Sequence, residues 1–98
     1  MNQLPVIDNY GEYKSGNYGV NSLRVTFPYK LTLYYSYKTI IAFMGSHGLK
    51  VRQNDWSTTT GKHLNWIDGG KKELRLKGEE FESLLIKELE HYGLAESK

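Results

Sequence analysis

Alternation of apolar and polar residues predicts an antiparallel sheet in the first half of the chain. The alternation runs over residues 23–27 and again over 31–36, and Pro28 favours a tight turn between these two runs. A third run, 39–44, is apolar and rich in β-branched residues, and a fourth, 49–54, alternates again. We therefore expect about four strands joined as a meander.

A helical repeat follows the sheet. Residues 79–92 place apolar side chains at helical spacing, and Gly93 is a residue type that commonly ends helices. Before this helix, a run of hydroxyl residues precedes 61–67 and predicts a short helix, with one threonine of Thr58–Thr60 as its N-cap. Residues 71–77 are expected to add a short edge strand. The apolar stripe of the C-terminal helix comprises Phe81, Leu84, Leu85, Leu89 and Tyr92.

These elements predict one α+β domain, in which an antiparallel sheet of about four strands carries the C-terminal helix on one face. A short helix follows the fourth strand. Within a single domain of residues 1–98, we expect a loop-rich segment (1–22), a β-meander (23–55), the capped short helix (56–70) and the C-terminal helix (78–93).

The face of the sheet away from the C-terminal helix is predicted to be open and basic. Basic residues beside an aromatic ring on an open sheet are typical of proteins that bind single-stranded nucleic acid. The alternative is an ordinary solvated face. Phe43 or Ile41 should also point there, which argues for a partner, either nucleic acid or protein. The helix would cover Leu23, Val25, Leu31, Leu33, Leu49 and Val51, and the open face would present Arg24, Thr26, Thr32, Tyr34, Lys50 and Arg52.

Composition and charge narrow the classes of function. The chain is 39% hydrophobic and 24% charged, as in globular proteins, and its lack of cysteine excludes disulfides and thiolate metal sites. We expect no signal peptide and no membrane span, because no apolar run is long enough. The net charge of +2 is uneven: residues 1–77 hold 11 Lys or Arg against 5 Asp or Glu, and residues 78–98 hold 2 against 6. The basic part favours a polyanionic partner.

The segment 54–66 concentrates candidate binding chemistry, with two tryptophans, four consecutive hydroxyl residues and a Gly–Lys pair. A phosphate-binding loop would need glycine where Trp56 stands and Ser or Thr where His63 stands, so nucleotide hydrolysis is not expected. Lys62 and free backbone N–H groups could hold one anion, although simple N-capping explains the same residues. We expect His63 to be structural rather than a general base, Trp56 to be in the core, and Lys62 to be exposed.

Two motifs resemble a small domain of unknown function found in bacteriophages and prophages. Ser36–Phe43 is similar to the family pattern SY-x-T-x-x-AF, and Asn54–Asn65 resembles N-x-[WF]-S-x-TTGKH. The resemblance covers about residues 20–85. It implies a phage-encoded protein that acts in the host bacterial cytoplasm, and it supplies no activity. It also suggests a shared feature made of Asn54, Trp56, Ser57, Thr59, Thr60, Gly61, Lys62 and His63.

We therefore predict a non-enzymatic phage accessory protein that binds nucleic acid or a host nucleoprotein complex, for example as an anti-CRISPR-type inhibitor of host defence. The alternatives are a purely protein-binding inhibitor or modulator of host machinery and, third, a small hydrolase that uses His63. No catalytic residue, metal or cofactor is expected, and the oligomeric state stays open, a homodimer included. The predicted binding residues are Arg24, Tyr34, Lys50, Arg52, Asn54, Trp56, Thr59, Thr60, Lys62 and His63.

Overall fold

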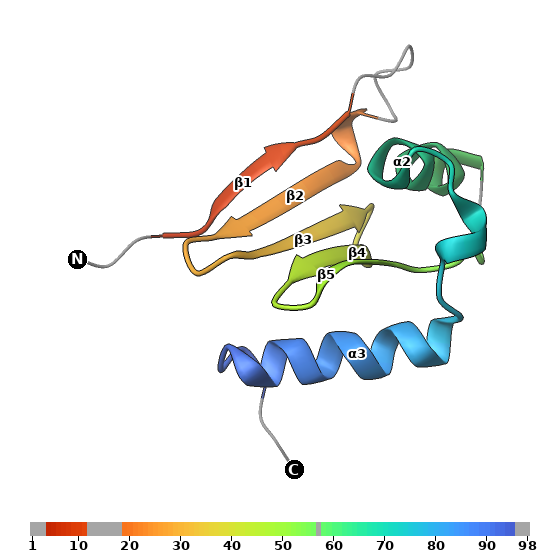
Figure 1. The fold of residues 1–98 in the computed structure, drawn as a ribbon. Helices are drawn as coiled ribbons and strands as arrows, with labels where there is room; N and C mark the ends of the chain where they lie inside the picture. Colours follow the sequence, from red (N-terminus) through yellow and green to blue (C-terminus); the bar gives the residue numbers. More distant parts are fainter. Residues whose placement is uncertain (1–3, 12–18, 57, 96–98) are drawn as a thin grey trace.

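The fold is an α+β arrangement built on one five-stranded antiparallel sheet, in which each strand pairs with the next along the chain (Figure 1). The computed structural model describes residues 4–11, 19–56 and 58–95. The predicted fold class is confirmed, with one strand more than expected. The elements are β1 (Val6–Asn9), β2 (Ser22–Phe27), β3 (Leu31–Ser36), β4 (Thr39–Gly45), β5 (Gly48–Val51), α2 (Thr58–Asp68), the 3-10 helix η1 (Lys72–Leu74) and α3 (Gly78–His91).

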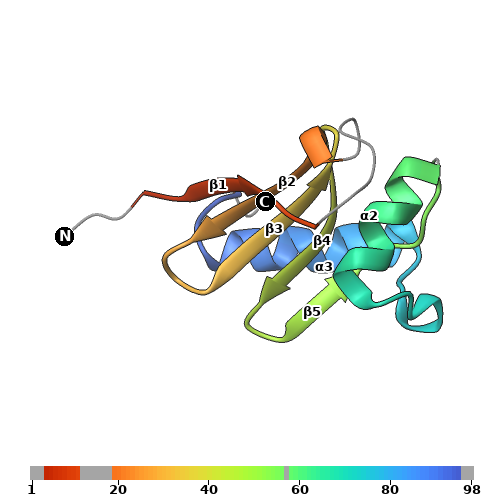
Figure 2. The same cartoon turned by 90° about the horizontal axis from the view of Figure 1, so that it is seen from above.

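Helices α2 and α3 cover opposite faces of the sheet. Figure 2 shows α2 in front of the strands and α3 behind them. The neighbouring residues Ala42 and Phe43 of β4 belong to separate core clusters, as expected from the alternating side-chain directions of a strand. Within the described residues, no helix is long and apolar enough to cross a membrane.

The larger core lies under α3, and it confirms the predicted helical stripe. The C-terminal end of α3 is also as expected: Gly93 has a φ of 75°, and the Leu94 N–H donates to the Leu89 carbonyl at 2.8 Å. The buried members of this cluster are Leu31, Leu33, Phe43, Phe81 and Leu85, and Val25, Phe27, Tyr35, Ile40, Leu76, Leu84, Leu89 and Tyr92 pack around them.

The second core lies under α2 and corrects the prediction of an open sheet face. Leu49 and Val51 were expected beneath the C-terminal helix, but they face α2, where Leu64 is fully buried. The reason is the register of the β4–β5 hairpin, which pairs Phe43 with Lys50 and so sends the apolar residues of β5 to the other face. The expected exposure of Phe43 or Ile41 is also wrong, since both are buried.

A β-bulge lets the apolar run of β4 serve both cores. Tyr34 pairs with Ala42 and Tyr35 with Ile40, so Ile41 is an extra residue without a direct partner in β3. Ile41 and Ala42 then pack towards α2, whereas Ile40 packs in the cluster under α3. A run that is apolar throughout therefore indicates a strand covered on both sides.

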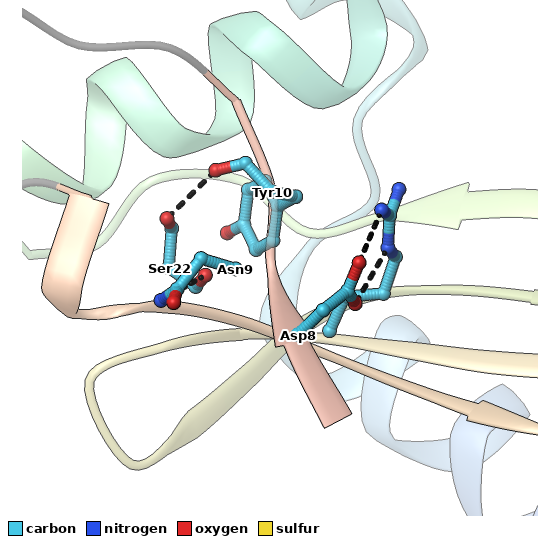
Figure 3. Close-up of polar contacts among 5 residues, drawn as sticks. Asp8, Asn9, Tyr10 and Ser22 are labelled. Atoms are coloured by element: carbon cyan, nitrogen blue, oxygen red, sulfur yellow. Dashed lines mark hydrogen bonds and ion pairs between the residues drawn. The ribbon is translucent and has the colours of Figure 1, made fainter. Parts of the chain in front are cut away.

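Strand β1 was not predicted, because its residues neither alternate nor are buried. It pairs antiparallel with β2 and leads to Tyr10, which is buried between β3 and α2 and whose hydroxyl donates to the Tyr35 carbonyl at 2.9 Å. The Ser22 hydroxyl donates to the Tyr10 carbonyl at 2.8 Å, and the Asn9 amide donates to the Ser22 carbonyl at 3.2 Å (Figure 3). The expected loop therefore holds for at most part of 1–22, of which 1–3 and 12–18 lie outside the described residues.

The expected edge strand over 71–77 is also wrong. Residues 72–74 form η1, and the segment touches the sheet through one parallel bridge between Arg52 and Leu76. Arg75 is buried against α2, with its Nε 2.7 Å from a carboxylate oxygen of Asp68. Burial alone would raise the pKa of Asp68, but hydrogen bonds from Arg75 and the Gly70 N–H outweigh it and keep that pKa below its usual value. This buried ion pair holds the segment against α2 instead of along the sheet.

Candidate binding site

The predicted basic face does not form, because its cations lie on different sides of the sheet. Arg24 and Tyr34 are paired across β2 and β3 on the side of α2. Lys50 is paired with Phe43 on the side of α3, and Arg52 reaches Glu82 of α3 at 2.8 Å. Tyr34 also packs edge-on to Tyr10, with ring centroids 5.4 Å apart, and is half-buried in the core under α2.

The two arginines of that predicted face are already neutralised. Arg24 donates two hydrogen bonds to the Asp8 carboxylate, at 3.1 Å and 2.7 Å (Figure 3). The hydrogen bond from Arg24 lowers the pKa of Asp8, and the same pairing raises the pKa of Arg24. Arg52 lies 2.8 Å from Glu82 and 3.7 Å from Asp55. Neither arginine therefore offers an unbalanced charge to a phosphate group.

The structure instead brings the two sequence motifs together at one hydroxyl group. Ser36, at the end of β3, places its Oγ 3.0 Å from Thr60 Oγ1 and 2.7 Å from His63 Nδ1. All three residues are buried. The contact joins the SY-x-T motif to the first turns of α2, as is usual for buried polar groups that pair with each other. Ser36 was not among the predicted site residues, and the first motif was the signal that could have identified it.

A cavity of about 400 Å³ lies over this contact, between the β3–β4 turn and the start of α2. Its most exposed wall residues are Tyr37, which has a φ of 57° in the turn, and Trp56, and each is 46% exposed. The expected core position of Trp56 is therefore wrong. The guanidinium carbon of Arg52 lies over the Trp56 ring, 4.8 Å from its centroid, and the remaining ring surface faces the cavity or solvent. The lining combines Ser36, Tyr37, Thr39 and Ile41 of the first motif with Trp56 and Thr60 of the second.

Asn54 fixes the loop that carries Trp56. Its side-chain oxygen accepts a hydrogen bond from the Trp56 N–H at 3.0 Å, which ties the Asn54 side chain to the backbone of this loop. Its amide nitrogen packs on Gly61, where an added Cβ would lie only 3.1 Å away. Asn54 and Gly61 therefore act as one unit that sets the loop against the helix.

The remaining second-motif residues lie on α2. Lys62 is exposed as predicted, Thr59 is half-buried, and Leu64 and Ile67 face the core under α2. The helix begins at Thr58, so Thr58–Thr60 form its first turn instead of its N-cap. Ser57, which precedes them, lies outside the described residues.

A contact between Ser36 and His63 is also what a serine nucleophile needs. Here both side chains are buried, and Ser36 shares its hydroxyl with Thr60, so the geometry favours a structural link between β3 and α2. Among the described residues, no three His, Cys, Asp or Glu side chains are grouped to hold a metal ion.

Comparison with known proteins gives one result. A search of curated proteins and a search of solved structures each found no match. One family model matches residues 4–83, a span that contains the whole sheet, α2, both motifs and every residue that lines the cavity between Tyr37 and Trp56. The chain therefore belongs to a family of unknown function, DUF8033.

Proposed function

We propose that this protein is a non-enzymatic binding protein, and that it recognises a macromolecule through the cavity between Tyr37 and Trp56. One observation carries the proposal: two half-exposed aromatic rings flank a cavity of about 400 Å³ whose walls come from both motifs. Exposed Trp and Tyr side chains beside a cavity commonly mark binding sites, because a partner group gains both apolar contact and a polar edge. The group that enters would be flat or apolar.

The partner that we favour is nucleic acid, either alone or in a nucleoprotein complex. An unstacked base has the shape and the π-face that Trp and Tyr bind. Lys38 follows Tyr37 in the turn, Lys62 lies on α2, and both are exposed. Neither forms an ion pair with a carboxylate of the described residues, so both are available to phosphates.

A protein partner is the second candidate, and the pairing of the arginines favours it. Arg24 and Arg52 are balanced by carboxylates, and none of the described residues that line the cavity carries a charged side chain. An apolar side chain of a protein could therefore fill the cavity without any phosphate contact. In either case, the setting that we propose is a phage-encoded accessory protein in the host cytoplasm, where it would inhibit a host complex, as an anti-CRISPR protein does.

The test compares Trp56→Ala with Trp66→Ala. Trp66 is also 46% exposed, but it lies outside the cavity lining, which makes it a matched control. Binding of labelled single-stranded DNA and RNA would be followed by fluorescence anisotropy at several salt concentrations. We expect Trp56→Ala to weaken the binding free energy by about 2 kcal/mol, which is roughly a thirtyfold loss of affinity. The free energy of unfolding should change little.

Salt dependence separates the two partners. Phosphate contacts by Lys38 and Lys62 would make affinity fall steeply with salt, because bound counterions are released. A pull-down from nuclease-treated host lysate that depends on Trp56, without any oligonucleotide binding, would establish the protein partner instead. Equal binding of every partner by the wild type and Trp56→Ala would contradict the proposed site.

A further inference from the structure

A second cavity, of about 650 Å³, lies on the opposite side of the sheet, between α3 and the β4–β5 hairpin. That volume is within the range of small-molecule sites. Phe43 of β4 and Leu84 of α3 give it apolar walls. Lys50 of β5 and Lys87 of α3 also line it, so it combines apolar surface with two ammonium groups. No residue in the described part of the chain lines both this cavity and the one between Tyr37 and Trp56.

The two lysines differ from the arginines of this protein in their surroundings. Arg24, Arg52 and Arg75 each pair with a carboxylate. In contrast, no carboxylate of the described residues forms an ion pair with Lys50 or Lys87. These lysines come from different elements, β5 and α3, and the fold brings them to one cavity.

Glu88, the one carboxylate among the described residues of the cavity wall, is already occupied. Glu88 accepts hydrogen bonds from the Ser46 N–H at 2.8 Å and from the Ser46 hydroxyl at 2.8 Å and 3.0 Å. Burial alone would raise the pKa of Glu88, but these hydrogen bonds keep it below its usual value. His47 lies 3.9 Å from the same carboxylate, and His91 lines the cavity as a further nitrogen donor. The cavity therefore carries a surplus of cationic and N–H groups over carboxylate.

We propose that this cavity binds a small anion with an apolar body. The negative group would lie between Lys50 and Lys87, and the chain or ring would pack on Phe43 and Leu84. A carboxylate amphiphile and a phosphate-bearing nucleotide share this chemistry. A bare inorganic anion would leave the apolar walls in water, and a neutral apolar molecule would desolvate the two ammonium groups without compensation.

Two dyes that share one skeleton test this proposal. 1-Anilinonaphthalene-8-sulfonate carries the anion, and N-phenyl-1-naphthylamine is the same ring system without it. We expect saturable fluorescence enhancement of the sulfonate by the folded protein, with binding about tenfold tighter than that of the neutral dye. The melting temperature recorded with each titration shows that the dye binds the native protein. Equal affinity for the two dyes, or no enhancement of the sulfonate, would overturn the proposal.

Charge-matched variants locate the site. Lys50→Gln with Lys87→Gln should weaken sulfonate binding roughly tenfold, whereas Lys71→Gln with Lys72→Gln removes the same charge at exposed positions outside the lining of both cavities and should leave it unchanged. If the first double variant has a lowered melting temperature, the sulfonate affinity of the single variant Lys87→Gln is compared with that of the wild type instead, because Lys87 is exposed on α3. An equal loss of sulfonate affinity in both double variants would mean that only the net charge matters, and it would refute the site. Displacement of the dye by decanoate or by adenosine monophosphate then distinguishes the two ligand sources.

Discussion

Ser36 shows how much of this fold depends on a single hydroxyl group. It is the last residue of β3, and its two partners, Thr60 and His63, lie one turn apart on α2. A serine hydroxyl has one proton to donate and two lone pairs, so both contacts can be satisfied at once. The three side chains are buried, so bulk water has little access to a contact that is lost.

We therefore predict that Ser36→Ala destabilises the protein by about 1–3 kcal/mol, because it removes a hydrogen-bond partner shared by two buried groups. Urea denaturation followed by circular dichroism measures this change. Ser83→Ala, at an exposed position of α3, is the control and should change the free energy of unfolding by less than about 0.5 kcal/mol. If the two variants were equally stable, the Ser36 contact would contribute nothing to the fold.

At the scale of elements, sequence pattern predicts best where one face of an element is buried and its end is marked. Helix α3 satisfies both conditions, with a regular apolar stripe and a glycine at its end. Strand β1 satisfies neither, because its four residues are exposed and pairing with β2 alone makes it a strand. Lys50 shows a third limit: its face depends on hairpin register and on a second helix above the sheet, and neither is visible in the alternation of β5.

The link between the β4–β5 hairpin and α3 gives a prediction at this scale. Gly45 leaves room for the Glu88 carboxylate, because a Cβ at that position would clash with it. Glu88 has a pKa below its usual value of 4.5. A carboxylate with a lowered folded-state pKa stabilises the protein above its unfolded-state pKa, and this contribution is lost as pH falls through the folded-state pKa.

The free energy of unfolding should accordingly fall between pH 5 and pH 2 by more in the wild type than in Glu88→Gln. At pH 7 the variant should already be less stable, because glutamine accepts weaker hydrogen bonds from Ser46. Glu79→Gln, which removes an exposed carboxylate from the first turn of α3, serves as the control and should keep the wild-type pH profile. Parallel profiles for the wild type and Glu88→Gln would show that this link does not depend on ionisation.

At the scale of the whole molecule, the sheet separates two cavities. The second motif predicted part of the cavity between Tyr37 and Trp56. Trp56 and Thr60 line this cavity, Asn54 orients the loop that carries Trp56, and His63 contacts the Ser36 hydroxyl beneath it. Tyr37 was not predicted as a site residue although it belongs to the first motif, because only the fold places this turn residue in the same cavity wall as Trp56. The predicted cations lie on different faces because helices cover both sides of the sheet, and the uninterrupted apolar run of β4 was the feature of the sequence that pointed to this.

The arrangement predicts that the two cavities act independently. They lie on opposite faces, and no described residue lines both, so neither proposed ligand would directly contact the described residues that hold the other. Binding at one site alters affinity at the other only through a coupling free energy, and that coupling is the same in both directions.

Trp56→Ala should therefore weaken binding of the macromolecule and leave binding of the sulfonate dye unaffected, whereas Lys50→Gln with Lys87→Gln should do the reverse. The dissociation constant of the dye, measured with and without saturating macromolecule, should change by less than about twofold. A larger change would show that the sheet transmits binding from one face to the other, and the bulge at Ile41, whose strand packs on both cores, would then be the first place to look.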